Sequence, residues 1–374
     1  MGKYNVKFLF KRHKQIIASL LLATSCTVHA LDFSIFGDIT FSDSDAKNEP
    51  GAFALGALDL YATQRINDKT TGFVELVFEH NGEGFVSDLE RLWVRHDFSD
   101  ALQVAGGRFH SPLGYWNRTF HHGTYLQDSV GRPFFMDFED GSGGILPVHL
   151  IGLMATGDVG SFNYQVGISN GAGLDTSTCS GATISCTTRP ELNANNTSDQ
   201  NTNKAVIARG TYAPEDVGFQ VSLFTMIQSI AESATSTLGS SVGSSLFEQT
   251  IIGFDAHYET EMFDFTAEYF NITNDSNIGD KQSHSADAYY LQFGYRVYEA
   301  GKGYYRYASL DFDDADSYFQ ILATENKQVH HVIGFRHDVD EVNSVKIEFD
   351  RFDRGVAGLK SSNSIKLQWS FLIP

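Results

Sequence analysis

The chain has 374 residues, 13% of them aromatic, and a formal net charge of −19 at neutral pH. Because so acidic a protein repels phosphate groups, nucleic acid is excluded as its main partner. Glycine is abundant (34 residues) while proline (7) and methionine (5) are scarce, and with the aromatic content this composition favours strands and turns over helices.

Residues 1–30 are predicted to be a cleaved signal peptide. They hold five cationic side chains and no acidic one, and the apolar run Ile16–Ala23 is far below the roughly 18 residues that a transmembrane helix needs. The small residue Ala30 offers a cleavage site before Leu31, and an uncleaved anchor helix is the alternative. Cleavage would leave residues 31–374 with a charge of about −24, since −19 minus 5 is −24.

From Ser34 onward, apolar and polar residues alternate with a period of two, the pattern of strands with one apolar and one polar face. Sixteen strands are predicted, at 33–41, 53–65, 71–80, 89–98, 102–110, 149–156, 161–169, 204–213, 217–228, 249–259, 262–272, 286–298, 303–312, 328–338, 343–352 and 363–372. We expect the apolar positions Val74, Leu76, Phe78, Ile365, Leu367 and Trp369 to face lipid.

The connections between these strands alternate strictly between short turns and long polar loops. A soluble sandwich or propeller also alternates polar and apolar residues, but neither explains why every second connection is long. Residues 31–374 are therefore predicted to form an all-β fold, a transmembrane antiparallel β-barrel of about 16 strands, with turns in the periplasm and loops outside.

One stretch resembles a known group of proteins. Residues 107–152 contain GRFHSPLGYWNRTFHHGTYLQDSVGRPFFMDFED followed by GGILPVHLIGL. This block resembles Gram-negative porin-like outer-membrane proteins, and is loosely similar to the phosphate-selective porins. The resemblance implies a porin-like barrel of sixteen strands that forms a homotrimer and acts as a diffusion channel. The alternation Ile365 to Phe371 is similar to the ending that the barrel-assembly machinery reads in porins, although three further residues follow it.

The longest predicted loop, 111–148, is the third external one, and in porins of this size that loop narrows the lumen. The loop holds both basic and acidic residues, and arginines lie on the polar face of nearby strands, so a transverse field across the passage is expected. The pore-lining candidates are Arg91, Arg95, Arg108, Arg118, Arg132, Asp137, Glu139 and Asp140. Two alternatives stay open: a surface loop could carry the same charges, and the arginines could only support the wall.

Cys179 and Cys186 lie in a loop rich in Ser, Thr and Asn, and export to an oxidising compartment permits a disulfide between them. No spacing among His110, His121, His122 and His149 fixes a metal site, so no metal and no cofactor are predicted. No catalytic motif occurs, and no catalytic residue is predicted.

The sequence thus predicts an outer-membrane porin for small hydrophilic solutes or ions, with membrane lipids as its surroundings. The alternatives are an adhesin or structural barrel, or an outer-membrane hydrolase. Sixteen strands would enclose a lumen wide enough to conduct, which favours transport.

Overall fold

The computed structural model describes residues 31–45, 50–80, 84–121, 123–137, 144–181, 183–194, 201–236, 238, 241–322, 327–354 and 361–374. Sixteen long strands, each antiparallel to its neighbours, form a barrel that closes where the first strand pairs with the last. They are β1 (Asp32–Ser44), β3 (Leu58–Asn67), β4 (Thr70–His80), β5 (Phe85–Ser99), β6 (Leu102–His110), β7 (His149–Val159), β8 (Phe162–Ser169), β12 (Ala205–Tyr212), β13 (Phe219–Glu232), β14 (Ser245–Glu259), β15 (Phe263–Ser276), β16 (Ser283–Tyr298), β17 (Gly301–Phe312), β18 (Lys327–Asp338), β19 (Asn343–Arg354) and β20 (Ser362–Ile373).

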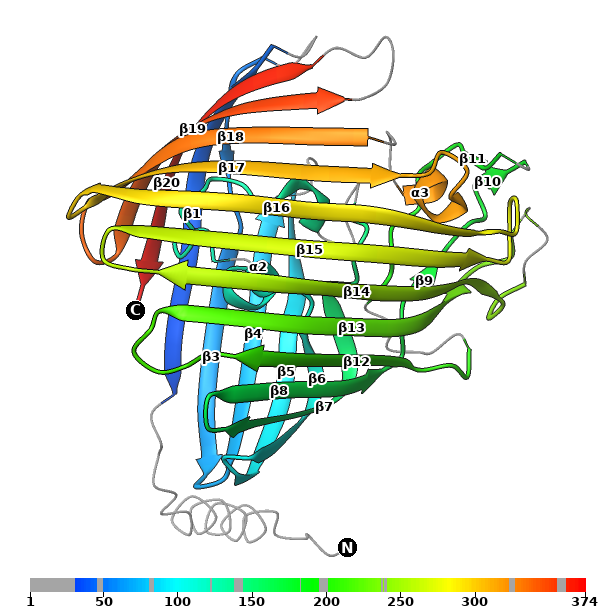
Figure 1. The fold of residues 1–374 in the computed structure, drawn as a ribbon, viewed down its shortest axis with the longest axis horizontal. Coiled ribbons are helices and arrows are strands. Elements are labelled where there is room, and N and C mark those ends of the chain that lie inside the picture. The colour runs from blue at the N-terminus through cyan, green and yellow to red at the C-terminus, as the bar shows by residue number, and fades with distance from the viewer. Residues whose placement is uncertain are drawn as a thin grey trace, which may run out of the picture.

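The predicted fold class and strand number are confirmed, and the predicted signal peptide lies outside the described residues. In Figure 1 the strands β12 to β18 cross the front of the barrel, with tight turns at the left. The other end carries the short helix α3 (Ser317–Leu322) and the short strands β9 (Gly173–Leu174), β10 (Cys179–Ser180) and β11 (Ser185–Cys186). The predicted alternation of turns and loops is therefore present in space, with turns at one end and long loops at the other.

No helix among the described residues is both long enough and apolar enough to cross a bilayer.

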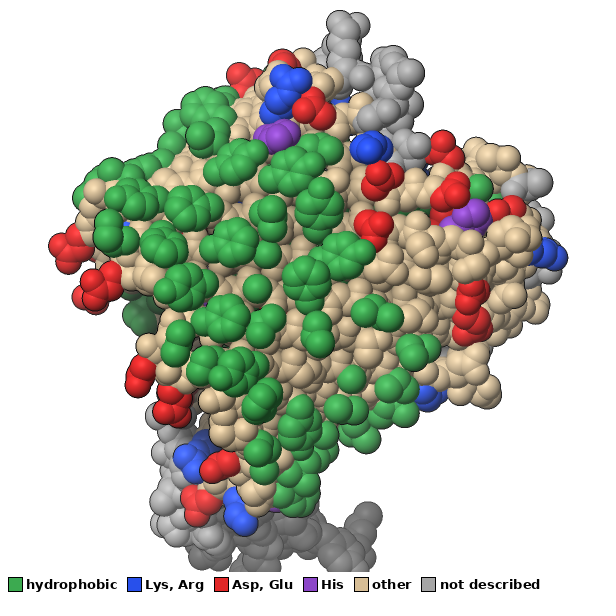
Figure 2. Space-filling model, viewed as in Figure 1, with side chains coloured by type: hydrophobic (Ala, Val, Ile, Leu, Met, Phe, Trp, Pro, Cys, Tyr) green, Lys and Arg blue, Asp and Glu red, His purple; other side chains and the backbone are tan. Residues whose placement is uncertain are grey.

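The outer surface is apolar because strand residues alternate between the two faces of a sheet. On β16, Leu291, Phe293 and Tyr295 are exposed, whereas Tyr290, directly before Leu291, is buried inside the barrel. Figure 2 shows hydrophobic side chains spread over this face, with acidic and basic residues gathered near its edges. This distribution suits a lipid-facing band, in agreement with the exposure of Leu76, Phe78, Leu367 and Trp369.

One predicted strand, 53–65, is interrupted. The structure divides it into β2 (Ala52–Leu55) and β3, both of which pair with β1. The main-chain N–H of Gly56 donates to the Asp38 carbonyl at 2.9 Å, and a Cβ at Gly56 would collide with the Asp38 carboxylate. The interruption therefore lets Asp38 approach the neighbouring backbone closely, which only glycine permits.

The interior is less polar than the alternation predicted. Buried apolar side chains of β13 to β16, including Phe224, Ile251 and Phe270, belong to one hydrophobic cluster with Leu113 and Trp116 of the loop 111–148. These inward positions are apolar because the loop covers them and excludes water. The barrel thus contains a packed core on one side of its lumen.

At the long-loop end, Cys179 and Cys186 lie opposite each other in the pair β10–β11, with their Cα atoms 3.9 Å apart and their sulfurs joined as a disulfide. The same loop reaches α3, where the Ile184 N–H donates to Gln320 Oε1 at 3.0 Å. The bridge therefore closes a small peripheral loop that packs on α3.

Leu291 and Gln292 give a matched test of the two faces. Leu291 lies mid-strand and is 43% exposed, whereas Gln292 borders an internal cavity. We expect Leu291→Arg to lower the free energy of unfolding by about 2–4 kcal/mol, because it places a cation in lipid. Gln292→Arg should have a much smaller effect, since its side chain faces water. Urea titrations of both variants folded into lipid vesicles measure this difference, and equal losses would contradict the assignment of faces.

Candidate functional site

The loop 111–148, which joins β6 to β7, lies inside the barrel. It contains the short helix α2 (Tyr115–Thr119) and the 3-10 turn η1 (Phe134–Met136). The main-chain N–H of Trp116 donates to Glu268 Oε1 on β15 at 2.7 Å, and that of Val130 donates to Glu348 Oε2 on β19 at 2.8 Å. Because these strands are far from β6 and β7 around the wall, the loop crosses the lumen.

Cationic side chains of the wall bind the carbonyl groups of the loop. Arg306 on β17 donates to the Gly131 carbonyl at 2.9 Å, the Arg132 carbonyl at 3.1 Å and the Ser129 hydroxyl at 3.0 Å. Lys346 on β19 donates to the carbonyls of Thr124 and Ser129. Carbonyls in an irregular segment have no strand partner, so these buried cations satisfy them with charge-assisted bonds.

Two further arginines bind other parts of the loop, Arg336 near its middle and Arg209 near its start. Arg336 on β18 donates to the carbonyls of Tyr125 at 2.6 Å and Gln127 at 2.9 Å. Arg209 on β12 donates to the carbonyl of Gly114 at 3.3 Å and pairs with Asp255 at 2.6 Å. The cations of four wall strands therefore determine where the loop lies.

A cavity of about 490 Å³ separates the loop from the opposite wall. It is lined by Asp38, Thr40, Gly56, Ala57, Glu79, His121, Thr124, Gln127, Val130, Gly131, Arg132, Phe134, Asp137, His330, Lys366 and Gln368. A second cavity, of about 260 Å³, contains Leu126 and Asp128 of the loop and Lys302 and Arg336 of the wall. The segment 124–128 contributes to both cavities, so polar space lies on either side of it.

Two of the predicted pore-lining residues, Arg132 and Asp137, border the larger cavity. The Arg132 guanidinium lies 5.0 Å from the centre of the Trp116 ring and donates to the Met136 carbonyl at 3.3 Å. Burial raises the pKa of Asp137, and the nearby charges of Arg132 and Lys366 partly offset that effect. The loop thus presents one cation and one carboxyl group to the same space.

Arg91 and Arg95 lie on β5 beside aromatic rings. Arg91 pairs with the buried Glu75 and lies 4.6 Å from the centre of the Phe73 ring. Arg95 pairs with Asp97 at 2.8 Å on its own strand. Neither is among the residues that line the larger cavity.

Arg108 and Arg118 are also outside that lining. Arg108 is buried, with its guanidinium 3.5 Å from Asp88 and 3.7 Å from Glu90. Arg118 belongs to α2, where burial and the charge of Arg209 lower its pKa to about 10. Glu139 and Asp140 lie outside the described residues, so their place beside the passage stays a prediction.

Sequence reasoning missed several residues of the site, namely Asp38, Glu79, Lys366, His330, Arg306 and Lys346. Each lies on a strand, and the alternation of polar and apolar residues places it on the polar face of that strand. The sequence carries no signal for which of these side chains would meet a loop that is distant from them in the chain.

Arg306 gives a test of the anchoring. We expect Arg306→Gln to free the loop, because it removes three hydrogen bonds from one charged group, each contributing about 1.5–3 kcal/mol. Amide hydrogen exchange over 124–132, measured by mass spectrometry, should become at least about tenfold faster. Arg351→Gln is the control, since the Arg351 side chain is 57% exposed and pairs only with Asp353 among the contacts described. Equal exchange in both variants would contradict the anchoring role.

Solved structures of similar shape include three outer-membrane proteins. The anion-selective porin from Comamonas acidovorans has 13% identity and a TM-score of 0.61, covering 92% of this chain and 99% of that chain. The outer-membrane channel DcaP of Acinetobacter baumannii has 12% identity and a TM-score of 0.62, covering 92% and 97%. The trimer form of OmpT of Vibrio cholerae has 11% identity and a TM-score of 0.58, covering 92% and 99%. At these identities the likeness shows the fold alone.

No curated protein matches the chain. The profile of the family described as Gram-negative porin, however, matches residues 121–354, more than half of the chain. This match includes most of the inserted loop and the cationic strands that hold it. The chain therefore belongs to the Gram-negative porin family and is a porin channel of the outer membrane.

Proposed function

We propose that the chain is a passive diffusion channel for small hydrophilic solutes, and that they pass between the inserted loop and the wall. The observation that carries this proposal is the cavity of about 490 Å³ beside the loop. Its lining draws on β1, β4, β18 and β20 as well as the loop, so the cavity lies between the loop and that part of the wall. The packed apolar cluster and the smaller cavity lie on the other side of the loop, and the larger polar space is the proposed route for solutes.

The charges around the cavity are nearly balanced. The described lining has three carboxylates, Asp38, Glu79 and Asp137, against two permanent cations, Arg132 and Lys366. Lys366 is itself paired with Asp350 on the neighbouring strand. We therefore propose weak charge selectivity, unlike the Comamonas porin, which is described as anion-selective, and passage of small dipolar as well as ionic solutes.

We also propose that the chain acts as a homotrimer in the lipid of the outer membrane, after cleavage of residues 1–30. A solved relative by fold, OmpT of Vibrio cholerae, is described in a trimer form. Insertion into the membrane would depend on the barrel-assembly machinery. That machinery would recognise the last strand by its alternating apolar and polar residues.

Reversal potentials across planar bilayers under a salt gradient test the proposed passage. We expect Glu79→Gln with Asp137→Asn to shift selectivity toward anions, because the cations then dominate the lining. Arg132→Gln with Lys366→Gln should shift it toward cations. Asp216→Asn is the matched control, since Asp216 is exposed in the β12–β13 turn.

Opposite shifts from the two pairs would place both charge sets along one passage. If neither pair differs from Asp216→Asn while the protein still conducts, solutes take another route. If the wild-type protein does not conduct at all, diffusion itself is the wrong function.

Asp137 should make selectivity depend on pH. Because burial raises its pKa, Asp137 takes up a proton at a higher pH than an ordinary aspartate, whose pKa is about 3.9. As the pH falls, the reversal potential should begin to move toward anion selectivity above the ordinary aspartate range. Asp137→Asn should remove this early movement, and its persistence in that variant would assign it to another group.

A further inference from the structure

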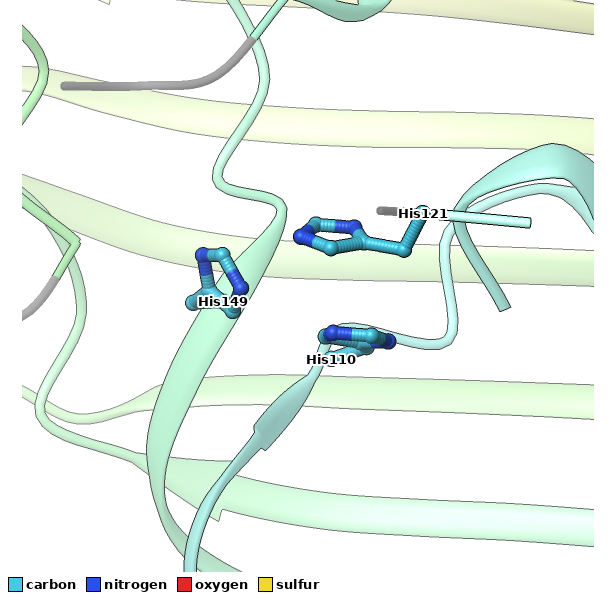
Figure 3. Close-up of side chains that lie close together, drawn as sticks. All are labelled: His110, His121 and His149. Carbon is cyan, nitrogen blue, oxygen red and sulfur yellow. The ribbon is translucent and has the colours of Figure 1, made fainter. Parts of the chain in front are cut away.

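Three histidines from separate parts of the chain meet where the inserted loop leaves the wall. His110 is the last residue of β6 and His149 is the first of β7, and the two are opposite each other in the register. His121 follows α2 in the loop. Figure 3 shows the three rings facing one another, and one ring nitrogen from each lies within 4.8 Å of the others.

The three rings are packed closely and largely shielded from solvent. The centre of the His121 ring lies 3.7 Å from that of His110 and 4.6 Å from that of His149. The side chains of His121 and His149 are each 3% exposed, and that of His110 is 7% exposed. Such a cluster places three basic nitrogens in a space with little water.

Asn117 determines which nitrogen of His121 points into the cluster. Its Nδ2 donates to the carbonyls of Ser111 at 2.9 Å and Val148 at 3.0 Å, so its Oδ1 must be the atom that faces His121 Nδ1 at 2.7 Å. His121 Nδ1 therefore donates to this oxygen, and in the neutral ring the lone pair is on Nε2. An outer partner that orients a histidine in this way is typical of metal ligation.

A carboxylate completes the set. Glu90 Oε2 lies 2.7 Å from His149 Nε2 and 3.8 Å from His121 Nε2, and Glu90 is buried. Glu75 Oε2 lies 3.8 Å from His110 Nε2.

The surroundings of the cluster also favour a cation. Three carboxylates, Glu75, Asp88 and Glu90, lie close to two guanidinium groups, Arg91 and Arg108. The two carboxylates nearest the rings, Glu75 and Glu90, are buried, and a buried carboxylate attracts an added cation strongly.

We propose that His110, His121 and His149, together with Glu90, form a binding site for a divalent transition-metal ion of the zinc class. Imidazole and carboxylate groups are the ligands that such ions prefer. Tetrahedral coordination needs ligand atoms roughly 3.3 Å apart, so closure from 4.8 Å requires only small ring rotations. His121 borders the larger cavity, which provides a path by which the ion enters.

The proposed ion would tie the loop to both strands that flank it. His121 moves with the loop, whereas His110 and His149 belong to the wall. The ion would therefore hold the base of the loop, in addition to the contacts that Arg306 makes with residues 129–132. The ion-binding proposal is independent of the proposed diffusion function. Its test measures metal binding and not solute transport.

The test uses the full mature chain, purified in detergent, stripped with chelator and dialysed at pH 7.5. We expect calorimetry with Zn²⁺ to give one site per chain. His121→Gln and His149→Gln should weaken binding at least about 100-fold, and Glu90→Gln by about 10- to 100-fold. His330→Gln is the matched control, because His330 lines the same cavity but lies beside Asp350 instead. It should bind like the wild-type protein.

Folding of each variant is checked by the change in its electrophoretic mobility on heating. A second measurement, on the wild-type chain alone, covers the case in which a variant fails to fold. Co²⁺ added to the wild-type chain should give the intense visible absorption of a tetrahedral site, and Zn²⁺ should displace it. The proposal is overturned if wild-type chain binds no more tightly than His121→Gln. It is also overturned if His330→Gln loses binding equally, or if bound Co²⁺ keeps the weak spectrum of the aqueous ion.

Discussion

The contact between wall cations and loop carbonyls is the interaction on which the rest of this structure depends. An irregular segment inside a barrel cannot join a strand ladder, and its carbonyls still need donors. Arg209, Arg306, Arg336 and Lys346 supply these donors from fixed positions on four strands. Carboxylates such as Glu268 and Glu348 accept from the loop N–H groups on the same wall. Buried charges of both signs therefore hold the loop in one position, since a displaced loop would leave them without partners.

This position divides the interior into two parts with different physical character. Toward β13 to β16 the loop and the wall bury apolar side chains against each other, and the smaller polar cavity of about 260 Å³ lies between the loop and β14 to β18. Toward β1, β4, β18 and β20 a polar cavity remains. The proposed passage beside the loop depends on this anchoring, because the same contacts that pack one side keep the loop away from the other. In that proposal, the charges that solutes meet are those that line the larger cavity.

The histidine cluster lies at the base of the loop, where β6 ends and β7 begins. Asn117 binds the carbonyls of Ser111 and Val148, the first and last residues of the loop, and so holds its two ends together. The same amide orients His121 toward Glu90 and His149. A metal ion there would add a second fixed point to a loop already held by Arg306, and the proposed solute passage and the proposed ion site would then share one loop.

The sequence by itself determined the number of long strands, their approximate positions and the face to which most of their residues belong. This was possible because strand alternation is local, so Leu291 and Tyr290 could be assigned to opposite faces without knowledge of any partner. The loop 111–148 was recognisable by its length and by its resemblance to porins. Arg132 and Asp137 were found for the same reason, since they lie within that loop.

Only the tertiary structure decided which distant groups meet. The bulge opposite Glu75 and Leu76 inserts Glu90 into β5, and Gly107 has a φ of 143°, so simple alternation no longer predicts where Glu90, Arg108 and His110 point. The partners of Arg306 and of His121 depend on how the loop folds back across the lumen. The alternation of residues along a strand carries no information about such long-range contacts. Those contacts, rather than the strands, determine where the polar cavity beside the loop lies and which side chains line it.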